Sequence, residues 1–169
     1  MRNFIRLAAT GAALAAASFG STAYAADTES ATASAEVLST ITVTKDQDMS
    51  FGQIAVNANG TYILNPDSSH SCTSGLICTG TRRAAEFTIN GTVATAVSAV
   101  VTQSSINLVH TTDATKSFVL DNFAISFPDG NTLVPTGAQF NVGGRLNVVA
   151  ANAVAGVYSG TFNVSVEYM

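Results

Sequence analysis

The stretch AGVYSGTFNVSVEYM, residues 155–169, decides the fold of this chain. Apolar and polar residues alternate along it, and one face carries Tyr158, Phe162, Val164, Val166 and Tyr168. A period of two is typical of a β-strand that is buried on one face, so we predict a strand over residues 158–168. The strand contains no proline and one acidic residue, Glu167. Its free edge therefore lacks the features that normally stop an edge from pairing with another chain.

The rest of the chain repeats this pattern in short runs separated by turn residues. We predict strands within residues 31–44, 49–56, 61–66, 84–91, 92–102, 105–110, 117–127 and 139–149. The two adjacent glycines, Gly143 and Gly144, predict a β-bulge in the last of these runs. Seven to nine short strands, with a turn about every ten residues, are typical of an all-β, immunoglobulin-like sandwich.

The N-terminus has the pattern of a secretory signal peptide over residues 1–25. Arg2 and Arg6 precede an apolar stretch too short to span a bilayer, and AYA offers a cleavage site between Ala25 and Ala26. We expect the mature chain to form an N-terminal arm, residues 26–37, and one sandwich domain, residues 38–169, with no membrane span after the signal.

Charge argues against nucleic acid as a partner. Without Arg2 and Arg6 the chain holds five basic and eleven acidic residues, a net charge of about −6. Binding to nucleic acid needs clustered Lys and Arg side chains, and the only basic pair is Arg82 and Arg83.

Two cysteines, Cys72 and Cys78, lie in a stretch read as a polar loop over residues 66–83. Export implies an oxidising compartment, so we expect a disulfide between them. His70 lies two residues before Cys72, but three ligands in one loop without a second cluster make a metal site the weaker alternative.

No residue pattern points to catalysis. The chain has no nucleophile elbow, zinc-protease motif or phosphate loop. His70 and His110 each lie in or beside a loop, and a calcium site would require the fold to bring Asp46, Asp48 and Asp129 together. We expect no enzyme activity, no metal and no cofactor.

The arm is the second unusual feature of the chain. It alternates through Ala31, Ala33, Ala35 and Val37, as a strand with one small apolar face would. A strand-like arm at one end and an open strand edge at the other favour strand addition between subunits. Such a head-to-tail contact does not close on itself, so it builds a fibre.

Two segments carry a resemblance to a known family. AEVLSTITVTKDQDMSFGQI, residues 35–54, and FNVGGRLNVVAANAVAGVYSGTFNVSVEYM, residues 140–169, resemble the first and last elements of bacterial chaperone–usher fimbrial subunits. The likeness is strongest to the spore coat protein U-like (archaic pilin) group and to a neighbouring family of unknown function among small secreted proteobacterial proteins. Met49 stands at the leucine of the L-x-F-G element, before Phe51 and Gly52. Gly156 and the penultimate Tyr168 match the strand that the chaperone grips.

The resemblance implies a sandwich that lacks its seventh strand. A periplasmic chaperone would first fill the groove beside the last strand, and at the outer-membrane usher the arm of another copy would replace it. The acceptor edge would then comprise Gly156, Tyr158, Phe162, Val164, Val166 and Tyr168, and the donor about residues 27–37. The implied product is a fimbria at the cell surface that supports adhesion or biofilm, and the chain would end where a strand from another molecule takes over.

Two departures from the pattern keep other functions open. Ile41 stands where archaic pilins often place a cysteine, and the donor face is rich in alanine, which buries little apolar area. A monomeric secreted or surface sandwich that binds a ligand in its loops is the main alternative. The absence of tryptophan counts against a sugar platform. An enzyme is the third and weakest alternative.

Overall fold

The computed structural model describes residues 28–169. The predicted signal peptide, residues 1–25, and the cleavage site between Ala25 and Ala26 lie outside the described residues. The chain divides into two compact units, Met1–Ala35 and Glu36–Met169. In the first unit, residues 28–35 are exposed and form neither helix nor strand.

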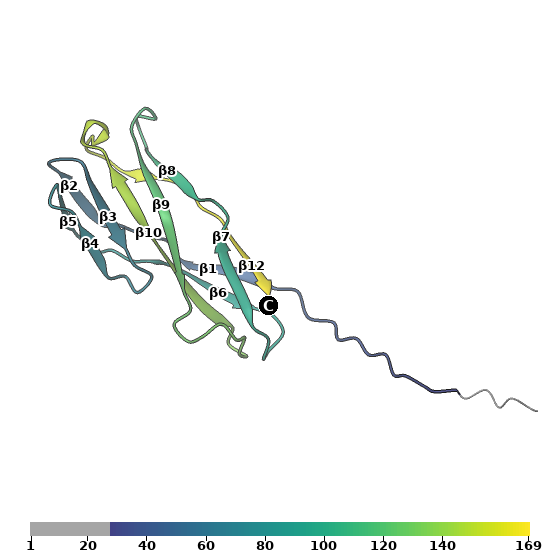
Figure 1. Ribbon diagram of the computed structural model, residues 1–169. Coiled ribbons are helices and arrows are strands. Elements are labelled where there is room, and N and C mark those ends of the chain that lie inside the picture. The colour runs from purple at the N-terminus through teal and green to yellow at the C-terminus, as the bar shows by residue number, and fades with distance from the viewer. Residues whose placement is uncertain (1–27) are drawn as a thin grey trace, which may run out of the picture. The chain divides into compact units, whose positions relative to one another are not determined.

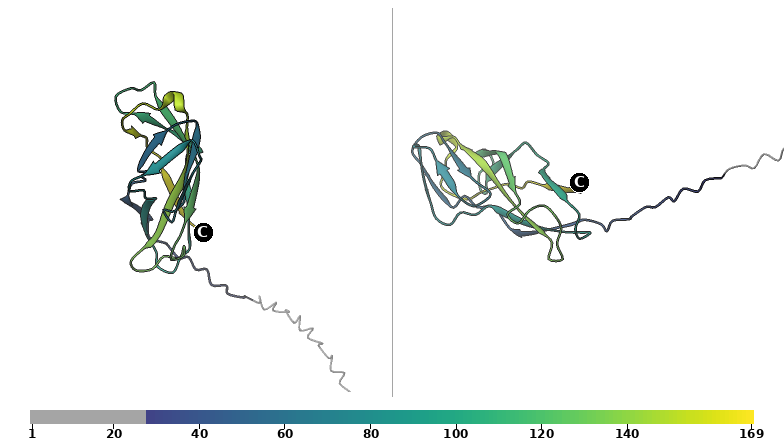
Figure 2. Two further views of the ribbon diagram at one scale, coloured as in Figure 1. Left: turned by 90° about the vertical axis from the view of Figure 1, so that its left-hand side faces the viewer. Right: turned by 60° about the horizontal axis from the view of Figure 1, so that its bottom comes forward.

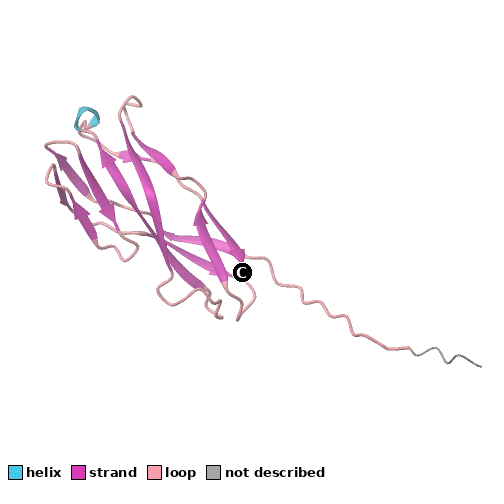
Figure 3. Cartoon of the chain, viewed as in Figure 1, coloured by secondary structure: helices cyan, strands magenta, loops and turns pink. Residues whose placement is uncertain are grey.

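The second unit is built of β-strands, as Figure 3 shows. The strands are β1 (Thr42–Gln47), β2 (Gln53–Val56), β3 (Gly60–Leu64), β4 (His70–Cys72), β5 (Leu76–Thr79), β6 (Ala85–Asn90), β7 (Val97–Val101), β8 (Ser105–His110), β9 (Ser117–Ser126), β10 (Ala138–Val148), β11 (Tyr158–Ser159) and β12 (Val164–Tyr168). The single helical element of the described residues is a short 3-10 turn, η1 (Ala150–Asn152). The predicted all-β sandwich is confirmed.

All strand pairs are antiparallel, and β10 is the centre of the network (Figures 1 and 2). The main sheet runs β1-β6-β10-β9-β8-β11, and β3 and β4 extend it from β10. The first half of β10 pairs with β6 and its second half with β3, while β9 covers its other edge. Two further pairs, β12 with β7 and β2 with β5, complete the strands.

The core comes from alternating side chains of the central strands. In β6, Ala85, Phe87 and Ile89 are buried while the residues between them are not. The ring of Phe87 stacks on Phe140 of β10 at a centroid distance of 5.0 Å. Burial of one large apolar side chain stabilises the fold by about 1.5–3 kcal/mol. This alternation explains why period-two runs in the sequence predict the sheet correctly.

Three expectations about elements need correction or refinement. The region 66–83 is not a polar loop, because β4 and β5 lie within it and the confirmed Cys72–Cys78 disulfide joins them. Residues 92–96 form a turn and an isolated bridge, and a strand begins only at Val97. The expected strand over 158–168 is divided, since residues 160–163 belong to neither β11 nor β12. A fourth expectation also needs correction, because the predicted bulge in residues 139–149 lies in the partner strand. Two steps along β10, from Gly143 to Arg145, face three steps along β9, from Ala124 to Asp121, so the extra residue belongs to β9.

Candidate strand-binding groove

The first and last strands of the sandwich each leave one edge without a strand partner in the described residues. β1 pairs with β6 alone, and β12 pairs with β7 alone. Residues 42–46 of β1 are exposed on both faces, which is unusual for a strand that borders a core. Both edges can therefore accept hydrogen bonds from a further strand.

A mainly apolar groove with a volume of about 990 Å³ lies between the segment around β2 and residues 153–162, next to but outside the free edge of β12. One wall comprises Lys45, residues 48–54 and Val56, and the other comprises residues 153–162. The floor includes Phe87, Ile106, Leu108, Phe118, Leu120 and Leu146. Most of these floor residues belong to the two core clusters. The groove thus exposes part of the core of the sandwich.

The six predicted acceptor residues divide into two groups. Gly156, Tyr158 and Phe162 line the groove. Val164, Val166 and Tyr168 lie outside it and pack against the core cluster that contains Phe87 and Phe140. Burial alternates along the stretch as expected, because residues 158, 162, 164, 166 and 168 are half-buried and the odd-numbered residues between 159 and 167 are exposed.

Phe162 lies where the last strand is interrupted. Its ring contacts Phe123 at 5.2 Å and Phe87 at 6.4 Å between centroids. The neighbouring residues, 160 and 161, form no strand, although they also line the groove. The interruption leaves backbone groups beside the groove outside any sheet ladder, and an added strand could pair with them.

Gly156 lies near the start of the second wall, at a point where no side chain fits. Its φ is +154°, and a Cβ atom here would overlap Nε2 of His110. His110 at the end of β8 is only 6% exposed, and Nε2 lies 3.2 Å from the carbonyl oxygen of Ala155. Tyr158 packs edge-on against the imidazole at 4.9 Å and stacks on Phe118 at 4.3 Å. These contacts fix the wall against β8 and β9.

Tyr168 ties the end of the last strand to the start of the first. Its hydroxyl donates to the carbonyl oxygen of Ser39 at 2.8 Å and accepts from the backbone N–H of Thr92 at 2.7 Å. The N–H of Ser39 in turn donates to Oγ1 of Thr92 at 2.7 Å. A Cβ atom at Gly91 would overlap the Tyr168 hydroxyl, so this turn needs glycine. The arm therefore leaves the domain from a fixed point at Ser39.

The candidate donor residues lie in a segment without secondary structure. Ala31, Ala33 and Ala35 are exposed and lie in no strand. Val37 is 93% exposed, the most exposed of the large apolar side chains described. Sequence reasoning predicted these residues as a donor, and the structure shows them as an extended, unpaired segment.

The residues considered for metal binding are dispersed. Asp48 pairs with Lys45 at 2.7 Å, and Asp46 accepts a hydrogen bond from Thr88. His70 belongs to β4 and packs near Tyr62. Over residues 28–169, no three His, Cys, Asp or Glu side chains lie close enough together to hold a metal ion.

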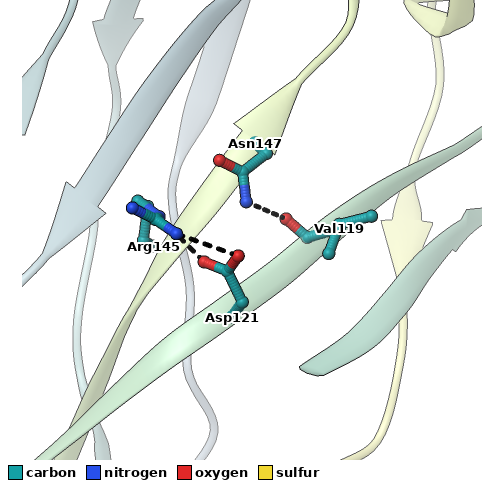
Figure 4. Close-up of polar contacts among 4 residues, drawn as sticks. All are labelled: Val119, Asp121, Arg145 and Asn147. Atoms are coloured by element: carbon teal, nitrogen blue, oxygen red, sulfur yellow. Dashed lines mark hydrogen bonds and ion pairs between the residues drawn. The ribbon is translucent and has the colours of Figure 1, made fainter. Parts of the chain in front are cut away.

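An ion pair joins the outer faces of β9 and β10. Arg145 donates from Nε to one carboxylate oxygen of Asp121 at 2.8 Å and from a terminal nitrogen to the other at 3.0 Å (Figure 4). The Arg145 hydrogen bond is the main reason why the pKa of Asp121 lies below its usual value. The pair lies on the face opposite Leu120 and Leu146. It therefore links β9 to β10 but does not line the groove.

Sequence reasoning missed the first wall and His110 as parts of this site. Residues 49–54 were predicted as part of a strand and as a family element, but not as a wall of a groove, although the apolar Met49, Phe51 and Ile54 were visible signals. His110 was read as a polar strand end. Its role depends on a contact with Ala155, which is 45 residues away, and no local pattern reveals such a contact.

The fold and the groove define an all-β sandwich that is open between residues 48–56 and residues 153–162. Residues 41–168, from β1 to β12, match the family described as Domain of unknown function (DUF4402), and the chain belongs to that family. This agrees with the expected likeness to a family of unknown function, while the likeness to chaperone–usher subunits stays a prediction. No curated protein and no solved structure matches the chain. No helix within the described residues is long and apolar enough to cross a membrane.

Proposed function

We propose that this protein is an exported structural subunit of a bacterial surface fibre, assembled by donor-strand exchange. The observation that carries the proposal is the apolar groove between β1–β2 and residues 153–162. In the fibre, the arm of one copy fills the groove of another. Before assembly, a periplasmic chaperone fills the groove, and an outer-membrane usher catalyses the exchange. The fibre supports adhesion or biofilm formation at the cell surface.

The position of the arm favours exchange between copies over self-completion. Ser39 is held by Thr92 and Tyr168, and the chain continues directly into β1. A hairpin that returned the arm into the groove of its own chain would need its turn at residues 38–41. This segment reads Leu-Ser-Thr-Ile and contains no glycine, asparagine or proline to form a tight turn.

The arm is long enough to serve as a donor. Residues 26–38 are thirteen residues, which span about 43 Å when extended at about 3.3 Å per residue. The wall that they would follow, residues 153–162, contains ten residues. Each alanine contributes one methyl group, and each buried CH₂ contributes about 0.8 kcal/mol, so main-chain pairing and Val37 carry much of the contact.

The test is a comparison of unheated and heated samples on a denaturing gel. Surface material sheared from the native host should give a ladder that collapses to one band on heating, because a strand trapped in a groove leaves slowly. A mature chain that lacks residues 26–36 should give no ladder yet bind an added peptide of residues 26–38. A single monomer band for the intact chain, heated or not, would overturn the proposal.

A monomeric secreted or surface binding module is the second candidate. The alanine-rich donor face favours it, since three methyl groups leave much of a 990 Å³ groove unfilled. In that case the groove holds an extended segment of a different protein, and the monomer band of the gel test is the expected result.

A further inference from the structure

Among the described residues, His110 is the one polar or charged residue that is buried. It joins two segments that are distant in sequence. Nδ1 accepts the backbone N–H of Thr112 at 3.2 Å and of Asp113 at 3.1 Å, in the turn after β8. Nε2 lies 3.2 Å from the carbonyl oxygen of Ala155, in the wall of the groove.

These contacts define the protonation state of the ring. Because Nδ1 receives two N–H donors, it carries no proton of its own. The single ring proton then lies on Nε2 and is donated to the carbonyl of Ala155. A proton added at Nδ1 would face the two N–H groups of the turn, so a cationic ring must give up these bonds or turn away from them.

The wall depends on the ring in two further ways. The glycine at 156 leaves the space that Nε2 occupies, and Tyr158 packs on the ring edge-on. The hydroxyl of Tyr158 also hydrogen-bonds to the backbone of Asn152 and Val154, so Tyr158 links the ring to the first residues of the wall. Displacement of the ring therefore acts on the backbone of residues 155–158, where the wall begins.

We propose that His110 is a positioning residue for the groove, and that its neutral ring holds residues 155–158 in the strand-binding arrangement. Protonation of the ring releases this part of the wall, so the groove binds an incoming strand more weakly in acid. The inference about binding rests on the proposed function, whereas the release of the wall does not.

The charged and titratable groups around the ring are few. Asp113 comes from the turn, Lys116 precedes β9, and Tyr158 comes from β11. The carboxylate of Asp113 accepts the hydroxyl and the N–H of Thr115, and these bonds lower its pKa. The ammonium of Lys116 donates to Ala151. The Asp113 carboxylate interacts electrostatically with the ring, but neither side chain hydrogen-bonds to it, so no direct partner would hold the ring in place once it is cationic.

The first experiment measures amide hydrogen exchange of the mature chain between pH 7.5 and 5.5, corrected for the intrinsic effect of pH. Histidine is the side chain whose ordinary titration, near pH 6.5, falls in this range. Protection of the Thr112 and Asp113 amides and of residues 157–159 should fall by up to about tenfold, the most that uptake of one proton by a histidine of ordinary pKa gives over this range. Unchanged protection would overturn the proposal, whatever the groove binds.

The second experiment measures binding of a labelled peptide of residues 26–40 over the same pH range. The wild-type chain should lose up to about tenfold in affinity toward pH 5.5, the most that uptake of one proton by His110 gives. His110→Gln places an amide near the position of Nε2 and does not titrate, so its affinity should not change with pH. His110→Asn keeps an acceptor for the turn but loses the link to Ala155, and it should bind weakly at all pH values.

His70→Gln is the matched control, because His70 lies in β4, outside the groove. It should retain the wild-type pH dependence. A pH dependence that survives in both His110 variants, or that disappears in His70→Gln, would overturn the proposal. If the wild-type chain binds no peptide at any pH, the proposed function fails, and hydrogen exchange alone decides the role of His110.

Discussion

Gly156 is the residue at which the smallest change should have a large effect. A methyl group here would overlap the His110 ring, and the φ of +154° is strained for any other residue. We expect Gly156→Ala to lower the free energy of unfolding by about 2–4 kcal/mol, from overpacking and backbone strain together. Urea unfolding of the mature chain measures this loss.

The control for this variant is Gly130→Ala. Gly130 has a φ of +88°, and no other atom lies within 4 Å of the position that an added methyl group would take, so only backbone strain applies. We expect Gly130→Ala to lower the free energy of unfolding by about 1 kcal/mol. If both variants lose the same free energy of unfolding, overlap with His110 adds nothing to the effect of Gly156→Ala.

Two tyrosines should respond in opposite ways to loss of their hydroxyl groups. The hydroxyl of Tyr62 is buried and makes no hydrogen bond of good geometry within residues 28–169. Burial raises its pKa, and the nearby Arg82 guanidinium offsets part of this increase. Tyr62→Phe should leave the free energy of unfolding unchanged or raise it by about 1 kcal/mol. Tyr158→Phe loses bonds to Asn152 and Val154 and should lower it by about 1–2 kcal/mol. Thermal unfolding of both variants tests the contrast.

At the scale of elements, the pair of Arg145 and Asp121 should make the β9–β10 contact sensitive to acid. The pKa of Asp121 is lowered in the folded state, so its contribution is present above about pH 4, the ordinary range of an aspartate, and is lost as the pH falls through the lowered value. Asp121→Asn should therefore lower the urea midpoint at pH 7 and have a smaller effect at pH 2. Because solvent reaches both side chains, the effect should be small.

Asp129→Asn is the control for this prediction, since Asp129 forms no ion pair among the described side chains. Its urea midpoint should follow that of the wild type at both pH values. An Asp121→Asn variant that also follows the wild type at pH 7 would mean that the ion pair does not stabilise the sheet.

The disulfide between β4 and β5 should stabilise the fold by a modest amount. The bridge closes a short loop between residues 72 and 78. The chain-entropy model gives about 2 kcal/mol for such a loop. The double variant Cys72→Ser, Cys78→Ser should thus remain folded with a lower urea midpoint. Complete unfolding of this variant in the absence of denaturant would show that the bridge does more than restrict the unfolded chain.

The sequence predicted elements well where one face packs on the core. Residues 85–89 and 117–127 alternate in burial as their apolar pattern requires. The predictions failed where distant contacts decide. Residues 92–96 have strand-forming Thr and Val, but Ala94 adopts a φ of 64° and its N–H bonds to Leu133, so the segment turns. Likewise, β4 and β5 exist because β3 and β2 pair with them, which no pattern within residues 66–83 indicates.

The groove was predictable only in part, because only one of its two walls has a local signal in the sequence. The alternation of residues 158–168 predicted its second wall, since that signal is local. The first wall and the link between His110 and Ala155 depend on how β1–β2 and β8 lie beside the last strand. Such placement is set by the whole fold, so a single sequence without relatives does not reveal it.

At the scale of the whole molecule, the two faces of the arm should differ in their importance for assembly. Ala33→Asp places a carboxylate on the face proposed to enter the groove. An unpaired buried charge costs about 3 kcal/mol or more, so the ladder on an unheated gel should disappear. Ser34→Asp places the same charge on the opposite face and should leave the ladder intact. Loss of the ladder in both variants, or in neither, would contradict the proposed orientation of the arm.

The bond between Tyr168 and Ser39 has a mechanical consequence. Ser39 is where the arm joins the domain, and Tyr168 ends β12, the last strand. Tension along a fibre would enter each domain at Ser39 and be shared at once with Thr92 and with the last strand. Most of the core would then carry little of this force. Tyr168→Phe should therefore cause a larger relative decrease in the rupture force of a stretched fibre than in the free energy of unfolding of an unloaded domain.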